Sequence, residues 1–100
     1  MGKYQVHQSD GNAEALEKAA KKLGLTIYKI GRPVDWLVLG YNRAAVCEVK
    51  QPKGKLEPGQ IACLRAAGDA GWVLREVADV IALYRYLRWH DEPTKPVDKP

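Results

Sequence analysis

The chain is poor in the residues that build disulfide-stapled or zinc-stapled scaffolds. It contains two cysteines and two histidines in 100 residues. Cys47 and Cys63 lie in apolar stretches and form no CxxC pair, which argues against a disulfide framework or a zinc site and predicts two buried, reduced thiols. His7 and His90 lie near opposite ends of the chain. That separation weighs against a catalytic centre built on a histidine cluster, such as that of the His-Asn-His nucleases.

Long apolar runs are also missing. No stretch approaches the ~18 apolar residues that a spanning helix needs, and the first residues, Met1 to Gln5, are polar and unlike a signal peptide. The sequence shows no internal repeat and no sequence-reading module such as a zinc finger or a basic zipper. We therefore expect a soluble, cytoplasmic protein with no membrane partner.

What the sequence does have is an ordinary globular composition with an excess of positive charge. Hydrophobic residues make up 46% and charged residues 28%, and the net charge is +4. A positive field favours polyanions such as nucleic acid or an acidic membrane surface. The basic residues concentrate in the middle of the chain, at Arg43, Lys50, Lys53, Lys55 and Arg65. The length suits one modest core, so we predict a single domain over 1–90, followed by a disordered, proline-rich tail over 91–100.

Apolar spacing and turn residues predict an alternation of helices and strands. Residues 1–9 show no clear pattern and are expected to form a loose arm. The expected elements are a helix from Asn12 to Gly24, strands over 25–30, 34–39 and 44–50, a helix from Pro58 toward Gly68 or Gly71, a strand over 72–74 and a final helix over 76–89. This α-β-β-β-α-β-α order predicts an α/β fold in which helices flank a mixed sheet.

Three charged residues interrupt the otherwise apolar hairpin formed by strands 34–39 and 44–50: Asp35, Glu48 and Lys50. Glu48 and Lys50 are two residues apart, so on a strand they project from the same face. If Leu39 faces Ala44, counting back along both strands places Asp35 opposite Glu48. A tighter turn would still leave Asp35 on the same face, and only a register shifted by one residue would separate them.

Two carboxylates opposed across a strand pair lie ~5 Å apart at their Cβ atoms. They repel each other, and the repulsion raises a pKa unless a cation lies between them. Oxygen-rich sites of this kind suit Mg²⁺. A lysine beside the metal can orient the attacking water and stabilise the charge that develops on phosphorus. The structural alternative is a plain ion pair, in which Lys50 only neutralises Glu48 and Asp35.

The surrounding residues resemble a known nuclease motif. Pro33-Val34-Asp35, followed after twelve residues by Glu48-Val49-Lys50, resembles the signature of the PD-(D/E)XK nucleases, with one residue inserted between the proline and the aspartate. The segment from Gln51 to Gln60 is similar to the one that follows the lysine in the VRR-NUC branch, the virus-type replication-repair nucleases. There, a glutamine opens a helix that ends near a glycine before the next strand. The resemblance covers about Ala13 to Leu74.

The resemblance implies a restriction-endonuclease-like αβββαβ core with a C-terminal helix added. It implies that the metal ligands are Asp35, Glu48 and the backbone carbonyl of Val49, that Lys50 is the catalytic lysine, and that Gln60 lies beside the site to position the lysine or a phosphate. A solvated helix residue is the alternative for Gln60. The implied cofactor is Mg²⁺, for which Mn²⁺ substitutes, and no organic cofactor is expected.

The family usually adds a glutamate from the first helix. Here the helical register lands on Ala13, so we predict that Glu14, one residue later, joins the site, with Glu17 in reserve. This is where the sequence departs most from the family pattern, and it leaves a second metal open.

DNA contacts are expected from basic residues around the site. Flexible lysines near a catalytic centre suit phosphate, which positions DNA without reading its sequence. The candidates are Lys53 and Lys55 in the loop after Lys50, together with Arg32 and Arg43. For the two lysines, a merely solvated loop is the alternative.

The last helix carries more apolar surface than one face of a small domain buries. Leu83, Tyr84, Tyr86 and Trp89 fall within it. Together with the family resemblance, they predict a homodimer.

The sequence as a whole predicts a metal-dependent DNA endonuclease that selects branched or junction DNA by its structure. Such a protein would serve viral or bacterial replication and repair, in a bacterial cell or a phage-infected host. The alternative is a non-catalytic DNA-binding or assembly subunit that retains the nuclease fold. The intact Asp35, Glu48 and Lys50 favour the enzyme, whereas the displaced helix glutamate favours the alternative.

Overall fold

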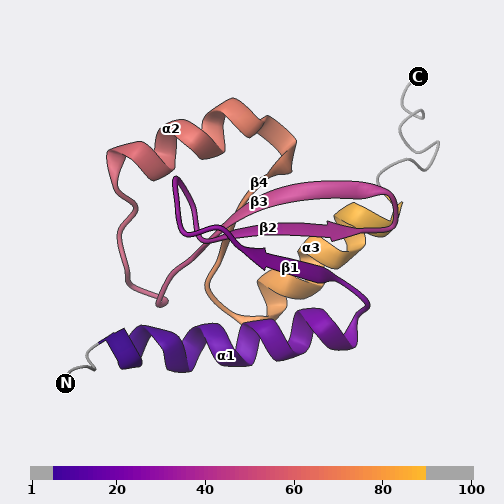
Figure 1. Ribbon diagram of the computed structural model, residues 1–100, viewed down its shortest axis with the longest axis horizontal. Helices are drawn as coiled ribbons and strands as arrows, with labels where there is room; N and C mark the ends of the chain where they lie inside the picture. The colour runs from indigo at the N-terminus through magenta and orange to yellow at the C-terminus, as the bar shows by residue number, and fades with distance from the viewer. Residues whose placement is uncertain (1–5, 90–100) are drawn as a thin grey trace.

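A computed structural model describes residues 6–89 of the chain (Figure 1). Its elements are α1 (Val6–Lys22), β1 (Thr26–Lys29), β2 (Trp36–Gly40), β3 (Arg43–Val49), α2 (Pro58–Ala67), the short 3-10 helix η1 (Gly68–Ala70), β4 (Gly71–Leu74) and α3 (Val77–Trp89). The predicted α-β-β-β-α-β-α order is confirmed, with η1 added before β4. In this range no helix combines the length and apolarity needed to cross a membrane. The tail predicted over 91–100 lies outside the described residues.

The four strands form one mixed sheet in the order β1-β2-β3-β4. The first two pairings, β1 with β2 and β2 with β3, are antiparallel, and β3 pairs with β4 in parallel. A parallel pair needs a long crossover connection, which the chain supplies with α2. The predicted α/β architecture, a mixed sheet with helices around it, is therefore confirmed.

The β2–β3 hairpin fixes the register of the residues that matter most. Tyr41 and Asn42 form its turn with φ of 54° and 68°, the left-handed values that a two-residue hairpin turn of this kind requires. Leu39 pairs with Ala44 as predicted. The strands run one pair further than expected, because Gly40 pairs with Arg43.

α1 begins earlier than the sequence suggested. It starts at Val6, whereas the apolar spacing begins only after Asn12. Extending a helix that has already formed costs little compared with starting one, so a polar first segment can continue the helix without an apolar stripe. The loose arm predicted over 1–9 is therefore wrong for residues 6–9, and residues 1–5 lie outside the described range.

The core lies on one face of the sheet, beneath α1 and α3, which pack against each other. The buried side chains are Leu16 and Ala20 of α1, Trp36 and Val38 of β2, Ala45 and Cys47 of β3, Leu74 of β4, and Val80, Leu83 and Leu87 of α3, with Leu25 beside them. Leu83 is therefore a core residue and adds nothing to a surplus apolar surface. Burial raises the pKa of the Cys47 thiol to about 12, as expected for an inert buried thiol. Cys63 is also a free thiol but is only half-buried.

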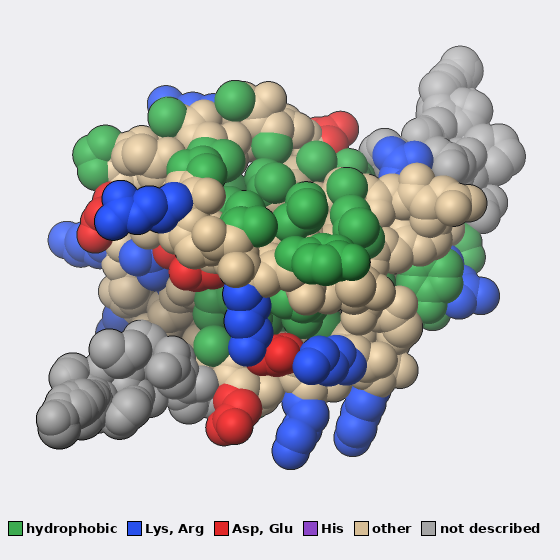
Figure 2. Space-filling model, in the orientation of Figure 1, with side chains coloured by type: hydrophobic (Ala, Val, Ile, Leu, Met, Phe, Trp, Pro, Cys, Tyr) green, Lys and Arg blue, Asp and Glu red, His purple; other side chains and the backbone are tan. Residues whose placement is uncertain are grey.

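α2 covers only half of the opposite face. It packs on β3 and β4 and has no fully buried side chain. Its close approach depends on Gly71, because a Cβ at that position would meet the backbone of Leu64. On the other half, Leu37 and Leu39 are half-buried and Tyr28 is 53% exposed. Figure 2 shows hydrophobic side chains gathered on this face between α2 and β1.

Candidate active site

An open cleft of about 600 Å³ lies at the end of β2 and β3 that is remote from the hairpin turn. Its walls come from α1, from the end of β1 and the segment that leads to β2, and from the end of β3 with the loop that follows it. All three charged residues singled out in the hairpin, Asp35, Glu48 and Lys50, line this cleft. The structure therefore gathers them in a space that a ligand can enter.

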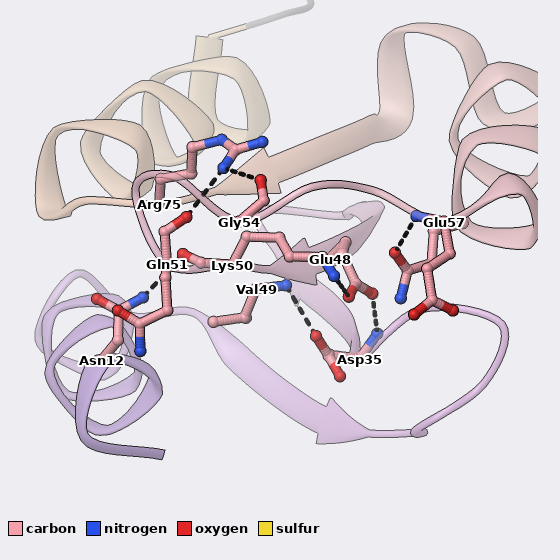
Figure 3. Close-up of polar contacts among 10 residues, drawn as sticks. Asn12, Asp35, Glu48, Val49, Lys50, Gln51, Gly54, Glu57 and Arg75 are labelled. Carbon is pink, nitrogen blue, oxygen red and sulfur yellow. Dashed lines mark hydrogen bonds and ion pairs between the residues drawn. The ribbon is translucent and has the colours of Figure 1, made fainter. Parts of the chain in front are cut away.

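Asp35 and Glu48 are each held by the backbone of the facing segment. Trp36, the first residue of β2, pairs with Cys47, so Asp35 continues the register opposite Glu48. The backbone N–H of Asp35 donates to Oε1 of Glu48 at 3.2 Å, and the N–H of Val49 donates to Oδ2 of Asp35 at 2.9 Å (Figure 3). These reciprocal bonds fix the two carboxylates beside each other at one point of the cleft.

Lys50 follows β3 directly and lies on the same side as Glu48. Its Nζ is 3.7 Å from Oε2 of Glu48, and the two side chains are only 18% and 5% exposed. Water screens such a pair far less than it screens a surface ion pair. The backbone N–H of Lys50 donates to the carbonyl of Leu74 at 3.1 Å, so β4 still holds the chain one residue beyond the end of β3. The predicted convergence of Asp35, Glu48 and Lys50 is confirmed as geometry.

Burial raises the pKa of Glu48 from 4.5 to about 7. The neighbouring charge of Asp35 acts in the same direction, while Lys50 lowers the value. The pKa stays raised even with the lysine in place, so the ammonium group of Lys50 does not offset burial together with the charge of Asp35.

This raised pKa predicts that the metal-free protein loses stability as the pH rises. The folded protein holds the Glu48 proton more tightly than the unfolded chain does, so the contribution is present below about pH 4.5 and is lost as the pH passes about 7. Glu48→Gln removes this titration. Its melting temperature should depend less on pH and should exceed that of the unmodified protein by several degrees at the alkaline end.

Thermal melts in EDTA, from about pH 5 to about pH 8, measure the difference. Glu76→Gln, at an exposed carboxylate before α3, is the matched control and should follow the unmodified protein. Identical pH profiles for Glu48→Gln and the unmodified protein would contradict the assignment of the raised pKa to Glu48.

The backbone of Val49 turns its polar groups toward the cleft. Its N–H bonds to Asp35, and in a strand the carbonyl of a residue points to the same side as its N–H. Two carboxylates and one carbonyl are therefore the oxygen donors at this point. Among the side chains that the structure describes, those of residues 12–89, no group of three or more His, Cys, Asp or Glu gathers to hold a metal. The donor set fits Mg²⁺, which proteins bind through one or two carboxylates while it keeps several waters.

Gln60 lies at the start of α2 and is not among the residues that line the cleft. Its Oε1 accepts a hydrogen bond from the backbone N–H of Glu57 at 2.8 Å, and the side chain of Glu57 accepts the return bond from the backbone of Gln60. This reciprocal pair is a capping box, which satisfies backbone donors at a helix start. Gln60 also lines a neighbouring hollow with Arg32. Its observed contacts thus belong to the helix cap, and its role beside Lys50 stays a prediction.

α1 presents Ala13 and Glu17 to the cleft, whereas Glu14 is exposed and does not line it. Successive helix residues are turned by about 100°, which carries Glu14 away from the face that Ala13 occupies. Glu17, the reserve candidate, faces the cleft but forms ion pairs with Lys29 at 2.9 Å and Lys21 at 3.0 Å. Hydrogen bonds from Lys29 and then Lys21 lower the pKa of Glu17.

The four basic residues predicted to contact DNA do not share one surface. Lys53 and Lys55 are exposed in the loop that lines the cleft, and Arg32 is exposed in the segment before β2. Arg43 lies at the hairpin end of β3, about 16 Å along the strand from the carboxylates. Its guanidinium is 5.6 Å from the ring centroid of Tyr86.

Two residues that sequence reasoning missed hold the chain just after β3. Asn12 of α1 donates from Nδ2 to the carbonyl of Lys50 at 2.9 Å. Arg75, directly after β4, donates from Nη1 to three carbonyls of the segment 51–54. No local sequence pattern marks either residue, because each acts on a segment that is distant along the chain.

The fold and the cleft together define an α/β protein with a shielded carboxylate pair and a lysine at the end of a hairpin. Comparison with protein-family models, with curated proteins and with solved structures gives no match. The function is therefore inferred from the residues and their geometry.

Proposed function

We propose that this protein is a metal-dependent DNA endonuclease with a restriction-endonuclease-like core. The observation that carries the proposal is the convergence of Asp35, Glu48 and Lys50 in an open cleft, with the two carboxylates fixed by backbone hydrogen bonds. The resemblance of the hairpin sequence to the PD-(D/E)XK motif implies the same grouping, in the same order along the chain.

Asp35, Glu48 and the carbonyl of Val49 would hold Mg²⁺, for which Mn²⁺ would substitute. When bound, Mg²⁺ makes hydroxide accessible near neutral pH and polarises the phosphoryl oxygens. The ammonium group of Lys50 lies beside the carboxylates. There it can orient the attacking water and stabilise the charge that develops on the phosphate. No organic cofactor takes part in the proposed hydrolysis.

DNA is the proposed substrate because the cleft is open and basic side chains surround it. Arg32, Lys53 and Lys55 are exposed around it, and the chain carries a net charge of +4. Contacts of this kind bind phosphate without reading bases. We therefore propose selection by DNA structure, such as branches or junctions, in viral or bacterial replication and repair.

One gel assay tests the proposal. Linear, nicked, flap and four-way DNA substrates are each offered with Mg²⁺, Mn²⁺, Ca²⁺ or EDTA. Cleavage with Mg²⁺ and Mn²⁺ that is strongest on branched substrates is expected. A protein that binds these substrates but cuts none of them with any metal would refute the enzyme and leave a DNA-binding or assembly subunit.

That alternative has one observation in its favour. Among the described side chains of α1, the carboxylate that lines the cleft is Glu17, and two lysines bind it. The family pattern expects a glutamate there that serves the site. A subunit that had lost catalysis could tolerate such a change.

Replacing both Lys53 and Lys55 with Ala should weaken DNA binding and flatten its dependence on salt. Each phosphate contact releases counterions, so losing two contacts should lower the slope of log K against log salt by about two. Fluorescence anisotropy over a salt series measures both quantities. Lys18 and Lys22 of α1, exposed but not lining the cleft, provide the charge-matched double control. Unchanged affinity and slope would show that the loop does not contact DNA.

The expected homodimer stays a prediction. Leu83 is buried within one chain, so the surplus apolar surface is smaller than the sequence suggested. The large apolar side chains that α3 exposes are Val77, Ile81 and Trp89, at 44%, 40% and 44%. A second copy would pack on these residues.

A further inference from the structure

The segment 51–54, which follows Lys50, is gathered around one nitrogen atom. Nη1 of Arg75 lies 2.9 Å from the carbonyl oxygen of Gln51 and 2.7 Å from that of Gly54 (Figure 3). It also lies 3.2 Å from the carbonyl oxygen of Pro52. Three carbonyl dipoles that point at one place repel each other unless a cation joins them. The shape of this turn therefore depends on the Arg75 guanidinium.

The 51–54 turn also lies close to the side chain of Lys50. The N–H of Gly54 donates to the carbonyl of Gln51 at 2.9 Å and closes the turn. A Cβ at Gly54 would lie 3.4 Å from Cδ of Lys50, so the turn passes close to the lysine stem and leaves little room for a side chain there. The backbone of Lys50 is held as well, at its N–H by Leu74 and at its carbonyl by Asn12.

We propose that Arg75 is a positioning residue for Lys50, acting through the 51–54 turn. A lysine stem has four rotatable carbons, so its ammonium group is placed only where the stem is packed. Arg75 does not line the cleft, so its proposed effect on the reaction runs through Lys50. The role rests on the proposed nuclease function, because it concerns the placement of the catalytic ammonium group.

Arg75→Ala should lower the single-turnover cleavage rate at saturating DNA by up to about 10²-fold, the cost of small misplacements of a catalytic group. The KM for DNA should stay unchanged. In a Lys50→Ala background the same substitution should cost nothing more, because the group that it positions is already gone. Arg85→Ala, which removes the same charge from the exposed face of α3, should change neither parameter. If Arg75→Ala lowers the cleavage rate by the same factor in the unmodified protein and in Lys50→Ala, Arg75 only supports the fold and the proposal is overturned.

Two measurements without DNA or metal separate this proposal from the proposed function. In Arg75→Ala, hydrogen exchange at the Gly54 amide should accelerate. Acylation of Lys50 by an activated ester, located by mass spectrometry, should accelerate relative to that of Lys18. If the unmodified protein cuts no DNA, the proposed nuclease function is wrong. The exchange rate at Gly54 and the acylation rate of Lys50 then decide by themselves whether Arg75 positions Lys50. Unchanged rates at both sites would overturn the positioning role even in an active nuclease. Arg75→Gln, which keeps an N–H donor without the charge, enters the same tests if the alanine variant does not fold.

Discussion

Glu48→Gln is expected to lower Mg²⁺-dependent cleavage by orders of magnitude while the fold is retained. The substitution keeps the size of the side chain and its ability to accept the Asp35 N–H, but it removes the charge that would hold the cation. Removing this charge should weaken metal binding strongly, because Glu48 is buried beside a second carboxylate and the low-dielectric surroundings do not replace the missing charge. Binding of Mg²⁺, followed by calorimetry, should weaken in parallel with cleavage.

DNA binding in EDTA distinguishes a lost metal from a lost substrate site. It should survive in Glu48→Gln, because the exposed basic side chains that would hold phosphate are untouched. Glu76→Gln removes an exposed carboxylate and should cut DNA like the unmodified protein. Equal cleavage with and without the Glu48 charge would mean that the chemistry lies elsewhere or in a contaminant.

Lys50→Ala should lose cleavage by a similar factor for a different reason. Asp35, Glu48 and the Val49 carbonyl remain, so Mg²⁺ binding should persist, but the group expected to order the attacking water is gone. Comparing calorimetric Mg²⁺ affinity with the cleavage rate separates the two variants: Glu48→Gln should lose both, and Lys50→Ala only the rate.

The double variant makes the comparison sharper. Metal activation and water positioning act in the same step, so the two losses should not add. A fully additive double variant would show that the two residues act independently and would contradict a shared site. A plain ion pair predicts a different pattern, in which each substitution alters the melting temperature and neither alters an activity.

The register of the β2–β3 hairpin could be predicted from the sequence because two local rules determine it. Strand side chains alternate with a period of two, and a short turn fixes which residues face each other, so the pairing of Leu39 with Ala44 places Asp35 opposite Glu48. Lys50 then follows on the Glu48 side. These are local facts, and the structure retains them.

Other parts of the candidate site needed information that a single segment does not contain. Asn12 and Arg75 reach Lys50 and its turn from α1 and from the end of β4, and only the assembled fold brings them there. Gln60 is different, since its observed partner is the nearby Glu57 at the start of the same helix. The sequence did not signal this capping box, because Glu57 is not one of the short polar residues that usually mark a helix N-cap. The family resemblance drew attention to a catalytic role for Gln60 and away from this local one.

Because β3 pairs in parallel with β4, a newly made chain can complete its cleft only after β4 has been synthesised and has paired. Asp35 and Glu48 meet through a hairpin of neighbouring strands, a short-range closure that forms quickly. The N–H of Lys50 must wait for Leu74, and the turn after it must wait for Arg75, which leaves the ribosome 21 residues after Gly54. A nascent chain would therefore carry its carboxylate pair before β4 and Arg75 can hold Lys50 and the turn after it. Under the proposed nuclease function, cleavage of nearby DNA would begin only after β4 has docked.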